Sequence, residues 1–187
     1  MKRSIICRIR GSLIFAGVAL TLFIADRLTK IAVMENIPWE RGAPTYHFSG
    51  ESRPVEVIDG FLYIVHITNE GAAWGMLSGQ TYLLSSIAVL ALAAMWFFRR
   101  ELELDTVSGQ VCAGMFAGGV VGNLADRILY GHVIDFIDVH LPLVNYRWPA
   151  FNVADCGICV GVCVYIILVF AADARRKKAG EKSAGKS

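Results

Sequence analysis

Residues 121–155 read VGNLADRILYGHVIDFIDVHLPLVNYRWPAFNVAD and connect two strongly apolar runs. Carboxyl groups are costly at or inside a membrane boundary, and where they occur there they usually serve a function. We therefore expect the rest of the chain to hold this stretch in place. It contains four aspartates and two Asn-x-x-Asp pairs, formed by Asn123, Asp126, Asp135, Asp138, Asn152 and Asp155.

The chain around this stretch has the composition of a membrane protein. Of its 187 residues, 55% are hydrophobic, and the mean hydropathy is +0.51. Four apolar runs are each about 18 to 23 residues long, enough to cross a hydrocarbon core of about 30 Å as an α-helix. The runs are 12–34, 81–98, 107–124 and 151–172. We therefore predict an α-helical polytopic membrane protein, with four transmembrane helices in a single domain, 1–173.

The basic residues predict the orientation of these helices. Most of the 18 Lys and Arg residues precede the first run, follow the second or follow the fourth. Under the positive-inside rule, both termini then lie in the cytoplasm, and 35–80 and 125–150 lie on the outer side. The Lys-, Gly- and Ser-rich tail, 174–187, is predicted to be cytoplasmic and disordered. The aspartate-rich stretch would therefore face outward.

The first apolar run has two interpretations. A basic start followed by an apolar run is typical of a secretory signal peptide. Here, however, the run ends in Asp26-Arg27-Leu28-Thr29-Lys30 rather than in small residues around a cleavage site. We favour a retained helix, because the i,i+4 spacing of Asp26 and Lys30 lets the two side chains pair on one helix face.

The five cysteines lie in or near the apolar runs, at Cys7, Cys112, Cys156, Cys159 and Cys163. A disulfide framework is not expected for thiols placed in this way. The last three would share one helix face, which suggests a metal site, but no second ligand pair stands at zinc spacing. Cysteine is also a common small apolar residue in packed interiors, and we favour that interpretation.

The segment between the first two runs is predicted to carry a small sheet. The turn-forming residues of 35–54 indicate irregular structure. Residues 55–68, VEVIDGFLYIVHIT, are rich in β-branched and aromatic residues and are interrupted by Asp59-Gly60, which predicts two short strands joined by a turn. The apolar residues that follow, around Trp74, are predicted to lie in the membrane interface.

Glycines predict close packing between the third and fourth runs. Gly114, Gly118 and Gly122 recur every four residues in the third run, and Gly157 and Gly161 do so in the fourth. Small residues four apart let helix backbones approach closely in lipid. The outer end of the third run should therefore lie near the outer start of the fourth.

Three aspartates could supply the chemistry of this region. Asp155 follows Asn152 by three residues, so a capping box at a helix start explains it without any function. The packing of the two runs favours Asp126 as its partner. Asp135 is flanked by apolar residues, which raise a carboxyl pKa, and a second carboxylate nearby separates the two values. Two such groups can share a proton and activate water, as in aspartic proteases.

A metal centre would use the same region. His132, Asp135, Asp138 and His140 are ligand types. No His-Glu-x-x-His pattern occurs, and a strand would place His132 and Asp135 on opposite faces. We therefore expect no metal, and we interpret His66 and His140 as polar surface or interface residues.

Short motifs occur in order over nearly the whole chain: DRLTK at 26–30, NEGAAW at 69–74, GNLADR at 122–127, VIDF at 133–136 and FNVAD at 151–155. Together they resemble the type II signal peptidases, the bacterial lipoprotein signal peptidases. The resemblance implies a membrane aspartic endopeptidase of the bacterial inner membrane. Its substrates would be prolipoproteins that already carry a diacylglyceryl group on the cysteine that becomes the new N-terminus.

The resemblance also implies roles for individual residues. Asp135 and Asp155 become the catalytic pair, which cleaves before the lipidated cysteine. Supporting or substrate-binding roles fall to Asn69, Gly71, Asn123, Asp126, Arg127, Asn152, Ala154, Asp26 and Lys30. We expect no cofactor and no nucleic acid partner, and a monomer that works among membrane lipids.

The sequence departs from the family pattern at two places. Trp74 stands where a phenylalanine is frequent, and the segment 35–54 is longer than usual.

Two other function classes remain open. They are a transporter or proton-conducting protein that uses the same carboxyl groups, and a non-catalytic helical scaffold. The clustering of the aspartates at one face, with no charge in the middle of a run, argues against a proton relay across the bilayer.

Overall fold

The computed structural model of the protein describes residues 5–41, 54–72, 76–102, 104 and 106–184. In this part of the chain, long helices alternate with short strands. In chain order the elements are α1 (Ile5–Asn36), β1 (Glu40–Arg41), β2 (Val55–Ile58), β3 (Leu62–Asn69), α2 (Thr81–Phe97), α3 (Val107–Tyr130), β4 (Val133–Leu141), the 3₁₀ turn η2 (Pro142–Val144), β5 (Tyr146–Arg147) and α4 (Val153–Ala184).

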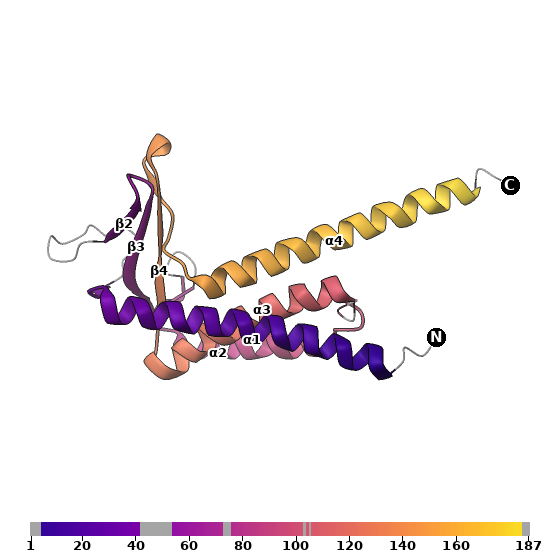
Figure 1. Ribbon diagram of the computed structural model, residues 1–187, viewed down its shortest axis with the longest axis horizontal. Helices are drawn as coiled ribbons and strands as arrows, with labels where there is room; N and C mark the ends of the chain where they lie inside the picture. Colours follow the sequence, from indigo (N-terminus) through magenta and orange to yellow (C-terminus); the bar gives the residue numbers. More distant parts are fainter. Residues whose placement is uncertain (1–4, 42–53, 73–75, 103, 105, 185–187) are drawn as a thin grey trace.

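The sheet crosses one end of the helices (Figure 1). α3 occupies the centre, where it makes extensive contacts with both α1 and α4. α4 begins beside the sheet and diverges from α1 and α3 toward its C-terminal end (Figure 1). The start of α1 and the end of α4 therefore both lie at the end of the helices that is away from the sheet.

Glycines on α3 allow these helices to approach closely. A Cβ atom added at Gly118 would lie 2.6 Å from the carbonyl oxygen of Ala19 on α1. A Cβ atom added at Gly119 would lie 2.8 Å from Ile158 Cγ1 on α4, and closer still to the carbonyl oxygen of Ala154. The predicted close packing of the third and fourth runs is confirmed, and α3 packs as closely on α1.

α3 runs past its predicted end to Tyr130. Thr106 caps the start of the helix with its side chain, and Gly131 ends it with φ +80° and an N–H that donates to Arg127 O at 3.1 Å. Glycine favours this left-handed position after a helix. The polar residues Asn123, Asp126 and Arg127 therefore lie on a continuous helix, where their spacing sets which ones share a face.

The predicted hairpin of 55–68 is present, but the sheet is larger. β2 and β3 pair antiparallel, and Gly60 adopts φ +66° in the turn between them. β4 pairs antiparallel with β3, and β1 and β5 extend the sheet that the described residues form. β4 escaped prediction because 133–136 is buried without alternation, so the strand lacks the usual period of two.

Among the residues that the structure describes, two helices are long and apolar enough to cross a membrane, namely α3 and Val153–Ala179 of α4, while α2 is a shorter apolar helix. α4 continues to Ala184, so the prediction of a disordered tail is wrong as far as the structure describes that tail. Trp74 and the greater part of the segment 35–54 fall outside the described residues.

The cysteines of α3 and α4 have different surroundings. Cys112 is buried, whereas Cys159 and Cys163 are exposed on α4. Packing in an interior therefore explains Cys112, and that interpretation is wrong for the two exposed residues, which face the surroundings of the bundle.

Candidate active site

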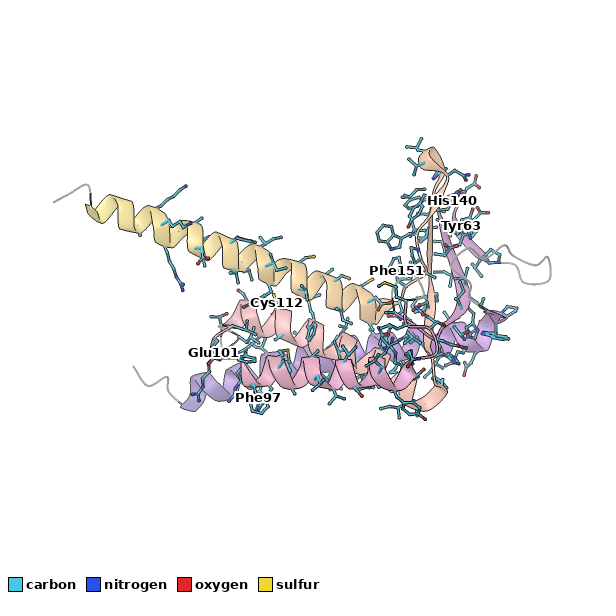
Figure 2. All side chains as sticks on the ribbon, turned by 180° about the vertical axis from the view of Figure 1, so that it is seen from behind. Tyr63, Phe97, Glu101, Cys112, His140 and Phe151 are labelled. Atoms are coloured by element: carbon cyan, nitrogen blue, oxygen red, sulfur yellow. The ribbon has the colours of Figure 1, made fainter. Side chains whose placement is uncertain are left out.

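Polar residues gather where α4 begins beside the sheet. Figure 2 shows Phe151 at this junction, whereas Phe97 and Glu101 lie at the opposite end of the helices. Phe151 joins the sheet, because its N–H donates to Ile137 O at 3.1 Å and its carbonyl accepts from Ile137 N–H at 2.8 Å. The chain therefore enters α4 directly from the sheet, and Asn152 lies fully buried between them.

Asn152 and Asp155 form a capping box at the start of α4. Asn152 Oδ1 accepts from the Asp155 N–H at 2.9 Å, and Asp155 Oδ2 accepts from the Asn152 N–H at 3.1 Å. This reciprocal arrangement fixes both side chains against the first turn of the helix. The predicted cap is confirmed, and it holds the Asp155 carboxyl group at the sheet end of α4.

Asn152 also connects Asp155 to Asp135. Its Nδ2 atom donates to Asp135 Oδ1 at 2.7 Å, and Asn69 Nδ2 donates to Asp135 Oδ2 at 3.0 Å. Asp155 Oδ1 accepts from Asn123 Nδ2 at 2.7 Å. Each oxygen of the two carboxyl groups therefore accepts a hydrogen bond from an N–H group, donated from β3, α3 or the start of α4.

β4 holds Asp135 in a dry environment. The strand pairs with β3, which ends in Asn69, and the neighbouring Ile134 and Phe136 are buried. Burial of Asp135, and then the nearby charge of Asp155, raise the pKa of Asp135 to about 7, although the hydrogen bonds from the asparagine amides oppose that shift. A carboxyl group in this state can hold a proton near neutral pH.

Asn123 is held from the side of α1 as well. Lys30 Nζ donates to Asn123 Oδ1 at 3.0 Å, and Asn152 Nδ2 donates to the same oxygen at 3.1 Å. Both donors are fully buried side chains. Asn123 thus connects the lysine of α1 with the carboxyl group of Asp155.

A buried cluster of charges joins α1 to α3 beside these asparagines. Lys30 Nζ lies 2.8 Å from Asp26 Oδ2 and 2.7 Å from Asp126 Oδ2. Arg27 forms a further ion pair with Asp126. The predicted pairing of Asp26 with Lys30 is confirmed. The packing hypothesis that paired Asp126 with Asp155 is wrong, because cations from α1 bind Asp126 instead.

The other residues predicted for the site are tied to the same region. Arg127 Nη2 donates to Gly71 O at 3.1 Å, and the Gly71 N–H donates to Asn69 Oδ1 at 2.9 Å. Ala154 is fully buried, and its N–H donates to Asp26 Oδ1 at 3.0 Å. Every residue predicted for the site therefore belongs to one connected set of hydrogen bonds and ion pairs.

Asp138 and His140 have partners elsewhere in the sheet. Asp138 is fully buried and forms an ion pair of 2.7 Å with Arg147 of β5, and His140 Nδ1 lies 3.2 Å from Gly60 O. Within the ranges that the structure describes, no three His, Cys, Asp or Glu side chains are grouped so that they could hold a metal ion. The metal alternative, which joins Asp135 and Asp138 in one ligand set, does not fit this geometry.

Arg27 and Arg147 were absent from the predicted set. Arg27 lies 5.7 Å from the centre of the Tyr130 ring while it binds Asp126, and Arg147 lies 5.3 Å from the centre of the Tyr63 ring. The sequence could have marked Arg27, because it is a cation at the end of an apolar run. It could not have marked Arg147, because the carboxyl group that pairs with Arg147 lies on another strand.

Comparisons with known proteins agree with the motifs. The family model described as signal peptidase (SPase) II matches residues 18–171. A lipoprotein signal peptidase of Ralstonia nicotianae is 38% identical over 160 residues, which cover 81% of this chain and 80% of that protein. A lipoprotein signal peptidase of Bacillus subtilis is 34% identical over 169 residues, which cover 89% of this chain and 99% of that protein.

The fold is similar to solved structures of bacterial membrane enzymes. One, determined by the in meso method at 2.3 Å resolution, matches with a TM-score of 0.71 and 30% identity over 84% of this chain and 88% of that chain. Another, at 1.9 Å resolution, matches with a TM-score of 0.66 and 31% identity over 81% of this chain and 89% of that chain.

These similarities define the protein as a peptide-bond hydrolase, a membrane aspartic peptidase. The chain belongs to the signal peptidase II family. The resemblance drawn from the five motifs is therefore confirmed.

Proposed function

We propose that this member of the signal peptidase II family cleaves the signal peptide from diacylglyceryl-modified prolipoproteins, at the peptide bond before the modified cysteine. One observation carries the proposal: Asn152 binds Asp135 through Nδ2 at 2.7 Å and Asp155 through its backbone N–H at 3.1 Å. Two carboxyl groups bridged in a buried site can share one proton. We call Asp135 and Asp155 the catalytic pair.

In the proposed reaction, water attacks the substrate directly. Ionised Asp155 takes a proton from water as the water oxygen bonds to the scissile carbonyl carbon, and protonated Asp135 gives its proton to the carbonyl oxygen. The tetrahedral intermediate collapses when Asp155 passes its proton to the leaving nitrogen and Asp135 takes one back from a hydroxyl group. The pKa of about 7 for Asp135 supports its role as the protonated partner.

The residues around the catalytic pair are proposed to hold it and to present the substrate. Asn69, Asn123 and Asn152 donate hydrogen bonds to its oxygens. Arg127 and Gly71 tie the loop after β3 to α3. The group that fixes the helices against one another consists of Asp26, Lys30, Asp126 and Ala154.

We further propose that all four helices cross the bacterial inner membrane, with both termini cytoplasmic and the site near the outer face. The basic cluster at 175–178 lies on the far part of α4, away from the sheet, as the positive-inside rule expects of a cytoplasmic end (Figure 1). Leu90 of α2 is 67% exposed and Phe170 of α4 is 70% exposed, as side chains that face lipid would be.

This arrangement suits a substrate that is both a spanning peptide and a lipid. Such a substrate is proposed to enter sideways from the bilayer, because its signal peptide and acyl chains never need to leave the apolar phase. A single peptidase domain, 1–173, acting as a monomer among membrane lipids, completes the proposal. A retained first helix is part of it, since Asp26 and Lys30 of α1 belong to the site.

A transporter or proton-conducting protein has no observation in its favour. Within the described residues, the fully or nearly fully buried charged side chains lie at the sheet end, so they do not form a relay along the helices. These side chains are Asp26, Lys30, Asp126, Asp135 and Asp138.

Asp135→Asn and Asp155→Asn test the proposal. Each removes one carboxyl group but keeps its shape, so we expect cleavage of a diacylglyceryl-modified precursor by the purified full-length protein to fall roughly 100- to 10,000-fold. Asp138→Asn is the matched control, since it changes a buried carboxyl group on the same strand that binds Arg147 instead. Cleavage at the wild-type rate by either pair variant would refute the assignment, and activity should persist in a chelator.

A further inference from the structure

Lys30 touches both the ion cluster and the hydrogen bonds of the catalytic pair. Its side chain is fully buried, and Nζ lies 2.8 Å from Asp26, 2.7 Å from Asp126 and 3.0 Å from Asn123. An ammonium group has three N–H donors and no acceptor. Two of these partners are carboxylate groups that pair with its charge, and the third is an uncharged amide that accepts a hydrogen bond from it.

The contact with Lys30 decides which way the Asn123 amide faces. Because the ammonium can only donate, the amide oxygen has to point toward Lys30, and Asn152 Nδ2 donates to that oxygen as well. The amide nitrogen is left to face Asp155 Oδ1 at 2.7 Å. A reversed amide would set donor against donor at Lys30 and acceptor against acceptor at Asp155.

The charged groups around the catalytic pair, which are buried or half-buried, are neutral together when they hold one proton on a carboxyl group. The charged groups that meet here are Asp26, Arg27 and Lys30 from α1, Asp126 and Arg127 from α3, Asp135 from β4 and Asp155 from α4. Four carboxyl groups and three cations are neutral together when one carboxyl group is protonated. Asp26, Lys30, Asp126 and Asp135 are buried, and a net charge on a network with such a buried centre is costly, so the neutral state is favoured.

The contacts of the four carboxyl groups explain why the catalytic pair, rather than Asp26 or Asp126, holds this one proton. Asp26 and Asp126 contact cations directly, whereas the hydrogen bonds described for the catalytic pair come from amide and backbone N–H groups. Glu70, in the adjoining loop, is exposed and screened by solvent. Cys156, on the first turns of α4, adds a thiol that is ordinarily uncharged at neutral pH.

We infer that Lys30 is the positioning residue of the catalytic pair: its ammonium turns the Asn123 amide toward Asp155 and supplies the charge that leaves this network neutral when the pair holds one proton. The inference rests on the proposed function, because it takes the pair as the reacting groups. Lys30 has no exposed surface, so it acts through Asn123 and through its charge.

The test compares the pH profiles of kcat for cleavage of a diacylglyceryl-modified precursor by the purified full-length protein. Lys30→Met removes the ammonium and keeps an unbranched apolar side chain. We expect kcat to fall roughly 10- to 100-fold, because the Asn123 amide is no longer held. Both limbs of the profile should move to higher pH by about one unit or more, because the pair ionises less readily once a neighbouring positive charge is lost.

Asp26→Asn provides the opposite perturbation. It removes a negative charge, so both limbs should move to lower pH. The double variant Asp26→Asn/Lys30→Met removes one charge of each sign, so its limbs should return close to the wild-type pH while kcat stays low. If Lys30→Met alone does not fold, these two variants carry the test by themselves.

Arg147→Met is the matched control for lost stability. This variant removes the cation that pairs with another fully buried carboxyl group, that of Asp138. Because Arg147 is 30% exposed and lies outside the network, the limbs of the pH profile of this variant should move by less than about one unit. Limbs that stay in place in Lys30→Met, or that rise in Asp26→Asn, would overturn the inference. A wild-type protein that cleaves no precursor at any pH would instead overturn the proposed function.

Discussion

Replacing Gly119 by alanine should push the first turn of α4 away from α3. An added Cβ atom would lie 2.8 Å from Ile158 Cγ1 and still closer to the carbonyl oxygen of Ala154, whereas ordinary contacts begin at 3.4 Å. The Ile158 side chain can rotate, but the Ala154 carbonyl is backbone and cannot move alone. The helix therefore has to retreat by roughly 1 Å, an overpacking that typically costs about 1–3 kcal/mol.

This displacement acts directly on the catalytic pair. Ala154 lies between Asn152 and Asp155, so its movement lengthens the bonds of 2.7 Å that join Asn152 to Asp135 and Asn123 to Asp155. A misplacement of about 1 Å near the reacting groups can cost about 100-fold in rate. We expect kcat/KM to fall about 100-fold, and the free energy of unfolding to fall by about 1–3 kcal/mol.

The assay measures precursor cleavage and thermal unfolding on one preparation of each variant. Gly17→Ala is the matched control, because nothing lies within 4 Å of a Cβ atom built at Gly17 and alanine is favoured over glycine in a helix by about 1 kcal/mol. This control should cleave at the wild-type rate and unfold at the same or a slightly higher temperature. Wild-type cleavage by Gly119→Ala would refute the idea that this glycine sets the position of α4.

The site and the sheet predict two further effects. Cleavage should decline as the pH rises above about 7, because the pKa of Asp135 is raised to about 7 and the carboxyl group loses its proton above that pH. A rate that stays constant up to pH 9 would contradict this. Asp138→Asn should lower the free energy of unfolding by about 1–3 kcal/mol, since it weakens a buried ion pair with Arg147. Denaturant unfolding measures that loss of stability. A large loss of kcat in the folded variant would contradict a purely structural role.

Local patterns predicted several features of the fold and the site correctly. The Asn152-x-x-Asp155 pattern before an apolar run predicted the capping box, and the spacing of Asp26 and Lys30 predicted their ion pair. These features join residues at most four positions apart. Their geometry follows from the period of a helix, whatever the rest of the chain does.

The sheet was only partly predictable for a related reason. The Asp59-Gly60 turn marks the β2–β3 hairpin, because a left-handed glycine in a tight turn leaves a local signal. β4 leaves almost none, since its first four residues, 133–136, are all buried and therefore do not alternate. The apolar residues that flank Asp135 in the sequence predicted a dry environment, but the burial itself comes from the packing of the folded chain.

The partner of Asp155 depended on contacts between distant parts of the chain. Asn69 reaches Asp135 across 66 positions, and Lys30 reaches Asn123 across 93. The family motifs selected Asp135, whereas the helix packing alone favoured Asp126. Competition among charges decides between the two, and the cations that bind Asp126 come from α1. Composition and spacing specify which groups the chain carries, but only the packing of α1 on α3 and of β4 at the start of α4 brings them within bonding distance.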